Sequence, residues 1–307
     1  MSATTQPLSL SRGGVFGRLL DYTELIKLRV TSLVMMTAWC GFYLAAARSG
    51  VTSLSWTLLH AVLGIGLVAG GTAALNQVVE RESDALMRRT NRRPLPAHRM
   101  GALHAAIFGT ALMLAGILYL ARAANPLTAL LAAATSAAYL FAYTPLKRRS
   151  PICTFVGAFP GAMPPVLGWA AARGALGWEP LLLFAIVWFW QFPHFHSIAW
   201  LYREDYERAR IRMLAVADER AAARQVVVYS LLLVPISMAP AWLRMAGTPY
   251  LAGAFALSAL FLWTGVRLAR PQTALAPAQS KQRARQVLQA SVFYLPLLFA
   301  LLMLNAK

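Results

Sequence analysis

Nine apolar runs divide this chain of 307 residues, and they limit the folds that it can adopt. Each run comes close to the roughly 20 residues that an α-helix needs to cross the hydrocarbon core of a bilayer. Hydrophobic residues make up 58% of the chain and charged residues only 13%, which excludes an ordinary soluble protein. The runs lie at about 30–47, 55–79, 102–121, 125–143, 151–172, 180–201, 225–243, 249–268 and 287–305. The sequence therefore predicts an all-α polytopic membrane protein with about nine transmembrane helices.

The distribution of basic residues supports this number of helices. Alternate loops of a nine-helix protein fall on opposite sides of the membrane, and Lys and Arg collect on the cytoplasmic side. One side holds every acidic residue except Glu179, and all but five of the 29 Lys and Arg residues. The five exceptions are Arg48, Arg122, Arg173, Arg244 and Lys307. We expect a cytoplasmic N-terminal segment (1–29) followed by a single transmembrane domain (30–307).

The net charge of +18 therefore belongs mainly to one face of the protein. A basic cytoplasmic face suits a bilayer that contains anionic lipid. Its basic residues are spread over five loops close to the membrane, which argues against nucleic-acid binding. The segment 1–29 is too polar for a cleavable signal peptide, so we expect the first span to be retained. Cys40 and Cys153 lie in apolar runs and are predicted to be buried without a disulfide.

Four prolines mark the fifth run as irregular. Pro151, Pro160, Pro164 and Pro165 interrupt its apolar pattern. Proline removes a backbone hydrogen bond inside a helix and clashes with the preceding turn. We expect a kinked or broken helix over 151–172.

Polar side chains recur every fourth residue at the end of the second run, at Asn76, Glu80 and Asp84. On a helix they form one polar face roughly 12 Å long. Amide and carboxylate oxygens suit a hard cation such as Mg²⁺, and the Arg-rich loop that follows suits phosphate. Acidic residues beside hydrocarbon are costly and commonly functional. The pattern predicts a site for a Mg²⁺-bound phosphorylated substrate.

A second acidic cluster follows the sixth run, on the same side of the membrane. It consists of Glu204, Asp205 and Glu207. We expect both clusters to face one central cavity, whose polar cytoplasmic mouth is capped by loops 80–101 and 202–224. Four helices separate the clusters, which suggests an internal duplication, although the residues show no clear repeat.

A plainer interpretation remains open for four of these loop residues. Glu204 and Arg208 have the spacing of a solvated ion pair on one helix face, and Glu82 and Glu207 could simply face water. Glu80 and Asp84 do not fit that interpretation, because they share a face with Asn76.

Five blocks occur in order along the chain. The first is Asn76-x₃-Glu80-x₃-Asp84, followed by Met87, Arg89-Thr90 and Arg93-Pro94-Leu95-Pro96. The others are Tyr143-Thr144-Pro145-Leu146-Lys147-Arg148, Gly157-Ala158-Phe159-Pro160-Gly161-Ala162-Met163-Pro164-Pro165 with Gly168-Trp169, Trp190-Gln191-Phe192-Pro193-His194-Phe195, and Tyr202-Arg203-Glu204-Asp205-Tyr206. The first block resembles the aspartate-rich motif of the UbiA superfamily of intramembrane prenyltransferases. The other four resemble the protohaem IX farnesyltransferase family, or haem O synthases, within that superfamily.

This resemblance implies transfer of a farnesyl group from farnesyl diphosphate to a vinyl group of haem B. Water addition then gives haem O, and diphosphate leaves. The resemblance also implies Mg²⁺ as cofactor, the lipid bilayer as surroundings and the bacterial inner membrane as location. It suggests haem A synthase or terminal-oxidase assembly proteins as protein partners.

The same resemblance assigns roles to individual residues. The catalytic residues and metal ligands are expected to be Asn76, Glu80, Asp84 and Asp205. The diphosphate-binding residues are expected to be Arg89, Arg93, Lys147 and Arg203. The residues that line the haem or prenyl cavity are expected to be Trp190, His194, Phe195 and Tyr202.

Four positions depart from the family pattern. Arg210 and Arg212 stand where a Gly and a Pro usually precede Met-Leu. Leu28 stands where a Pro is common between two basic residues, and Ser83 replaces an apolar residue before the last acid. None of the four removes an expected ligand, so they bear on substrate affinity more than on the type of reaction.

His194 has two competing interpretations. It lies in a Pro-containing aromatic stretch shortly before the second acidic cluster, where it could contact haem. A histidine inside a membrane span also commonly forms a hydrogen bond between helices. His196 is two residues away and should point to a different face of the helix.

Two other functions are also open. One is a UbiA-type enzyme that prenylates an aromatic quinone precursor; Glu80 in place of an Asp and the block 160–165 argue against it. The other is a carrier of haem or of an anionic lipid without chemistry. Two acidic clusters on one side of the membrane argue against a carrier, because transporter sites commonly lie near the bilayer midplane.

Overall fold

The computed structural model describes residues 14–49, 55–270 and 277–307. Within those ranges, nine helical spans are long and apolar enough to cross a membrane, so the predicted all-α class and number of spans are confirmed. Unbroken helices form seven of the spans: α2 (Leu28–Ala47), α3 (Trp56–Ala85), α4 (Ala102–Ala123), α9 (Trp178–Leu201), α12 (Glu219–Trp242), α13 (Thr248–Ala269) and α14 (Pro277–Leu304). The fourth span consists of α5 (Pro126–Ala137), a π-helical segment η1 (Ala138–Tyr143) and α6 (Thr144–Leu146). The fifth consists of α7 (Cys153–Ala162) and α8 (Pro164–Arg173).

The fifth span is broken at Met163, between α7 and α8, which confirms the expected irregularity. Pro164 is tolerated because it occupies the first turn of α8, where its missing N–H is not needed. The broken span packs closely on α2. A Cβ atom at Gly168 would lie 1.8 Å from the carbonyl oxygen of Ala38, so only glycine allows the two backbones to approach there.

Two spans begin earlier than their apolar runs. α12 begins at Glu219 rather than near 225, because the Asp218 side chain accepts a 2.9 Å hydrogen bond from the backbone N–H of Ala221. α14 begins at Pro277 rather than near 287. The first turns of both helices contain polar residues. A prediction from apolar runs therefore places the start of each helix too late, because the helix extends beyond the hydrocarbon.

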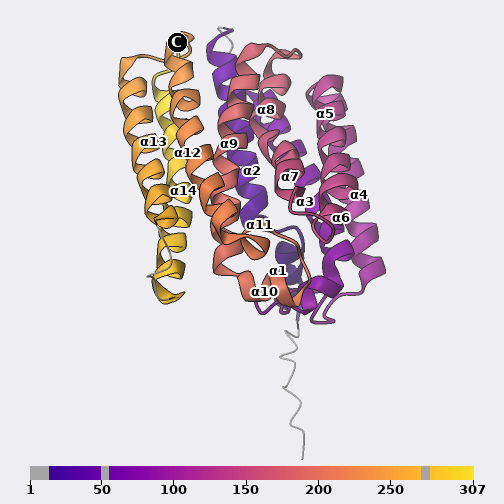
Figure 1. Ribbon diagram of the computed structural model, residues 1–307. Helices are drawn as coiled ribbons and strands as arrows, with labels where there is room; N and C mark the ends of the chain where they lie inside the picture. The colour runs from indigo at the N-terminus through magenta and orange to yellow at the C-terminus, as the bar shows by residue number, and fades with distance from the viewer. Residues whose placement is uncertain (1–13, 50–54, 271–276) are drawn as a thin grey trace, which may run out of the picture.

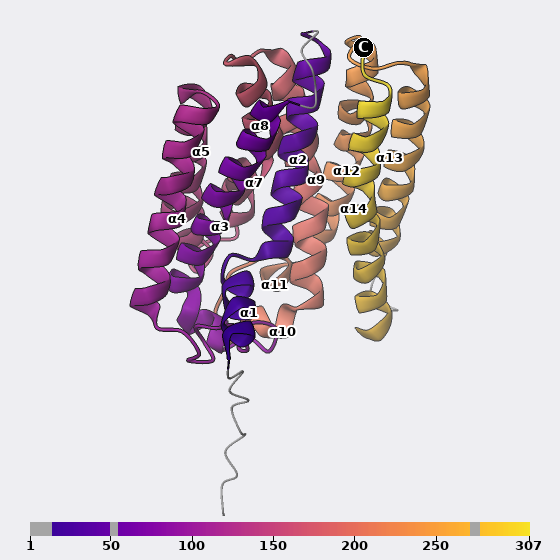
Figure 2. The same ribbon diagram turned by 180° about the vertical axis from the view of Figure 1, so that it is seen from behind.

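The helices form one elongated bundle (Figures 1 and 2). α9 lies between the group α12–α14 and the rest of the bundle. Three short helices gather at one end of the bundle: α1 (Val15–Leu25), α10 (Arg203–Arg208) and α11 (Leu214–Ala217). The C-terminus lies at the opposite end. Both cysteines are buried free thiols, as predicted.

Candidate active site

The polar face predicted on the second span lies at the end of α3. This helix continues beyond the apolar run to Ala85, so Asn76, Glu80 and Asp84 occupy its last turns. The side chains of Asn76 and Asp84 are buried, and that of Glu80 is only 12% exposed. Buried charges are costly unless they are paired, so each of these groups requires a partner.

Each side chain of this face contacts a cation from a different segment. Lys27, directly before α2, donates a 2.6 Å hydrogen bond to Asn76 Oδ1. Lys147, directly after α6, lies 2.7 Å from Glu80 Oε1. Arg93, in the loop after α3, lies 2.6 Å from Asp84 Oδ2. We call the residues Lys27, Asn76, Glu80, Asp84, Arg93 and Lys147 the charged centre.

The side-chain amide of Asn76 is held in one orientation. Its Nδ2 donates to Thr144 Oγ1 at 3.2 Å, and the Thr144 hydroxyl donates to the Tyr139 carbonyl oxygen at 2.8 Å. Tyr139 lies in η1, whose wider turn accompanies this local hydrogen bond. The amide oxygen of Asn76 therefore faces Lys27 and its nitrogen faces the Thr144 hydroxyl.

The two lysines of the charged centre differ electrostatically. Burial lowers the pKa of Lys27 to about 7, and the nearby Arg93 guanidinium acts in the same direction. Burial also acts to lower the pKa of Lys147, but Tyr143 and the Glu80 carboxylate outweigh it and hold this pKa well above its usual value. The Glu80 carboxylate therefore favours the charged form of Lys147, whereas burial disfavours the charged form of Lys27.

The second acidic cluster is tied to the loop after α3. Asp205 accepts 3.2 Å hydrogen bonds from the backbone N–H groups of Arg88 and Arg89, and it pairs with Arg208. The same loop also carries Arg93, the partner of Asp84. The segment 86–93 therefore links the two acidic clusters.

Two of the expected diphosphate-binding residues lie outside the charged centre. The Arg89 guanidinium lies 4.8 Å from the ring centre of Tyr202 and donates to the Tyr206 hydroxyl at 3.1 Å. Arg203 pairs with Glu207 and Glu219, and the hydrogen bond that it donates to the Glu207 carboxylate raises its pKa. Lys147 and Arg93 are the two that the structure brings to the buried carboxylates.

The plainer interpretation of the loop acids is partly wrong. Arg208 pairs with Asp205 rather than with Glu204, and Glu204 lies 3.0 Å from Lys281 on α14. The hydrogen bond from Lys281 lowers the pKa of Glu204. Glu82 is largely exposed, as that interpretation expected.

His194 contacts α14 rather than the charged centre. Its Nδ1 lies 2.8 Å from Ser291 Oγ, and its ring stacks on Trp190 with 4.7 Å between centroids. Trp190 Nε1 also donates to the Ser291 carbonyl oxygen at 2.8 Å. Phe195 lies next to this group, 5.7 Å from the His194 ring. These contacts favour a role in packing α9 against α14. His196 points elsewhere, as expected, and bonds Gln225 on α12 at 2.8 Å.

We expect His194→Ala to lower the melting temperature by the equivalent of about 1 kcal/mol and to weaken binding of both substrates to a similar degree. The matched variant Ser291→Ala removes the same hydrogen bond from the other side and should behave alike. The measurement combines melting curves with titrations of haem B and farnesyl diphosphate. A loss confined to haem B, with unchanged melting, would instead assign His194 to the acceptor site.

The donor groups at the end of α3 suit a hard divalent cation. They are one amide oxygen and two carboxylates on one helix face. Each of them contacts a Lys or Arg side chain, which occupies the place that a metal ion would take. Within residues 14–49, 55–270 and 277–307, no three His, Cys, Asp or Glu side chains converge closely enough to hold a metal ion. Metal binding would therefore require these ion pairs to exchange.

Sequence reasoning missed three side chains near the site. Lys27 was counted only among the basic residues of the N-terminal segment, yet its Nζ reaches Asn76. Thr144 was noted only as part of a block, yet it orients Asn76. Lys281 had no signal in the sequence, because only the packing of α14 brings it to Glu204.

Comparisons with known proteins agree with this architecture. The model of the UbiA prenyltransferase family matches residues 33–303. The protoheme IX farnesyltransferase of Koribacter versatilis (strain Ellin345) is 56% identical over 307 residues, which cover 99% of each chain. The chain belongs to the UbiA prenyltransferase family. The predicted membership is thereby confirmed, and the protein is a transferase.

Solved structures show the same fold at low sequence identity. A structure described as digeranylgeranylglyceryl phosphate synthase superposes on this prenyltransferase with a TM-score of 0.76 at 16% identity, covering 94% of this chain and 98% of the other. A UbiA homolog from Archaeoglobus fulgidus bound to GPP and Mg²⁺ superposes with a TM-score of 0.59 at 18% identity, covering 92% and 99%. The UbiA fold thus extends over nearly the whole prenyltransferase chain.

Proposed function

We propose that this prenyltransferase transfers a farnesyl group from farnesyl diphosphate to a vinyl group of haem B, giving haem O and diphosphate. The observation that carries the proposal is the 56% identity, over 99% of both chains, to a protoheme IX farnesyltransferase. The charged centre supports the same chemistry, because its partly buried cations suit a diphosphate and its oxygens suit a divalent cation.

The residues of this chain would act mainly by positioning and electrostatics. Lys147 and Arg93 offer N–H groups to diphosphate oxygens, and Lys27, which donates to Asn76, adds a third donor close by. Mg²⁺, held by Asn76, Glu80, Asp84 and Asp205, would supply charge that stabilises the leaving diphosphate. Exchange of the present ion pairs would free these oxygens.

An allylic cation must be protected from water until the acceptor attacks it. Tyr143 is half-buried and lies against Lys147, with 4.5 Å between its ring centre and Nζ. Phe192 and Tyr229 stack at 3.8 Å between α9 and α12. Such aromatic faces exclude water and stabilise positive charge. After attack by the vinyl group, one hydroxyl group from water completes the new side chain and a proton is released.

The charge distribution supports the proposed orientation, and the resemblance to bacterial farnesyltransferases supports the proposed membrane. We place the protein in the bacterial inner membrane with its N-terminus in the cytoplasm, because nearly all Lys and Arg residues lie on the side of the charged centre. Haem A synthase or terminal-oxidase assembly proteins are the partners we propose, since they would use the product.

The test is incubation of the purified protein with haem B, farnesyl diphosphate and Mg²⁺, followed by mass analysis of the haems. We expect a product heavier than haem B by one farnesyl group plus one hydroxyl group. An aromatic quinone precursor should remain unmodified under the same conditions. Prenylation of the quinone precursor in place of haem, or binding of haem without any product, would overturn the proposal.

A further inference from the structure

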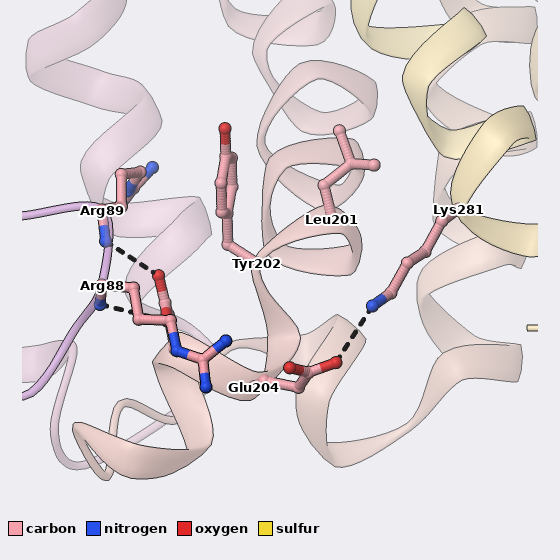
Figure 3. A pocket seen from close by; sticks show the side chains of 7 residues that line it. Arg88, Arg89, Leu201, Tyr202, Glu204 and Lys281 are labelled. Atoms are coloured by element: carbon pink, nitrogen blue, oxygen red, sulfur yellow. Dashed lines mark hydrogen bonds and ion pairs between the residues drawn. The ribbon is translucent and has the colours of Figure 1, made fainter. Parts of the chain in front are cut away.

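A cleft of about 400 Å³ opens beside the second acidic cluster, at the end of α9 (Figure 3). Its walls come from three parts of the chain: Arg88 and Arg89 after α3, Tyr202 after α9, and Lys281 in α14. Asp205 also lines the cleft and is bonded to the backbone of the loop 86–93, which reaches the charged centre. The cleft therefore adjoins the charged centre and shares Asp205 with the proposed metal site.

The cleft has cations on two sides and an apolar wall between them. Figure 3 shows Arg88 and Arg89 on one side and Lys281 on the other, with Leu201 and Tyr202 between them. Arg89 is fixed by its contact with the Tyr202 ring. This arrangement fits a ligand with an apolar body and more than one anionic group.

The counter-ion of Lys281 is easily replaced. Lys281 lies 3.0 Å from Glu204, but the side chain of Glu204 is 65% exposed. Ion pairs between exposed groups contribute little to stability, so an incoming carboxylate can take the place of Glu204. Asp205 is different, because it is buried and already bonded to two backbone N–H groups and to Arg208.

We propose that this cleft binds the propionate carboxylates of the haem acceptor, an inference that rests on the function proposed above. Protohaem carries two propionates on one edge of a flat apolar ring and its vinyl groups away from that edge. Binding of the propionates between Arg88 and Lys281 keeps the charges at the polar end of the bundle. The vinyl groups are then left free to reach the prenyl donor beside the charged centre.

The test compares haem B with its dimethyl ester, in which both propionates are neutral. The wild type should bind haem B more tightly than the ester, as measured by absorbance titration. Lys281→Gln and Arg88→Gln should each weaken haem B binding by about threefold to tenfold and leave ester binding unchanged. Arg220→Gln is the control, because Arg220 is an exposed cation at the start of α12 that does not line the cleft.

Glu204→Gln provides a test of opposite sign. Removing this carboxylate frees Lys281, so haem B should bind more tightly while ester binding stays the same. In the double variant Glu204→Gln/Lys281→Gln this gain should disappear. Farnesyl diphosphate affinity should not change in Lys281→Gln, since Lys281 lies outside the charged centre.

Three results would overturn the inference. The first is equal wild-type affinity for haem B and its ester, and the second is an equal loss of both in Lys281→Gln. The third concerns lipid: Lys281→Gln would abolish a preference for anionic over neutral phospholipid nanodiscs but leave the preference for haem B over its ester unchanged. That result would assign the cleft to a lipid phosphate. Failure of the proposed function has a different signature, in which neither haem form is farnesylated by the wild type.

Discussion

Glu80→Gln is expected to lower the rate of farnesyl transfer by about 100-fold or more in a protein that still folds. The variant should fold because the amide oxygen of Gln can still accept the hydrogen bond from Lys147, which now spans 2.7 Å. What it loses is the negative charge. That charge is needed to hold a divalent cation against the diphosphate, and in its absence the leaving group is poorly stabilised.

Glu82→Gln is the matched control, because Glu82 lies two residues away on another helix face and is 73% exposed. Its turnover should remain within about twofold of wild type, since surface pairs contribute little. Rates are measured by mass analysis of the product over a range of Mg²⁺ concentrations, and melting curves check the fold. Wild-type rates in Glu80→Gln at every Mg²⁺ concentration would remove Glu80 from the site.

Lys147→Met is expected to weaken farnesyl diphosphate binding by about tenfold or more and also to destabilise the protein. The side chain of Lys147 is 17% exposed and that of Glu80 is 12% exposed, so loss of the ammonium leaves a nearly buried carboxylate without its partner. Removing one member of such a pair costs about 3 kcal/mol or more.

The double variant Glu80→Gln/Lys147→Met separates stability from function. Its melting temperature should recover toward wild type, because no unpaired charge remains, while farnesyl diphosphate binding and turnover should stay low. The control is Arg148→Gln, a neighbouring exposed cation. Recovery of turnover together with stability would show that the pair is purely structural.

The polar face of α3 could be predicted from the sequence because the relation that creates it is local. Residues four apart share a helix face wherever the helix lies, so Asn76, Glu80 and Asp84 could be grouped without knowledge of the fold. The partners of this face could not be predicted in the same way. Lys27 and Lys147 are brought to it by the packing of helices, which leaves no periodic signal.

His194 illustrates the same limit. Its place in an aromatic stretch left a haem contact and a helix contact equally open, and the packing of α14 brings Ser291 within 2.8 Å of its ring. Lys27 is a second case, because its contact with Asn76 joins residues 49 positions apart in the chain.

The sequence by itself determined the membrane class, the number of spans, the break in the fifth span and the polar face at the end of α3. A helix needs a long apolar stretch to cross hydrocarbon, and such a stretch is visible in the sequence. The effects of proline and of helical periodicity extend over only a few residues, so these features can also be read locally. The tertiary structure alone decided which cations neutralise the acids, which loop links the two clusters and where the cleft beside Lys281 opens. Those contacts join residues far apart in the chain, and they depend on how the helices pack against one another.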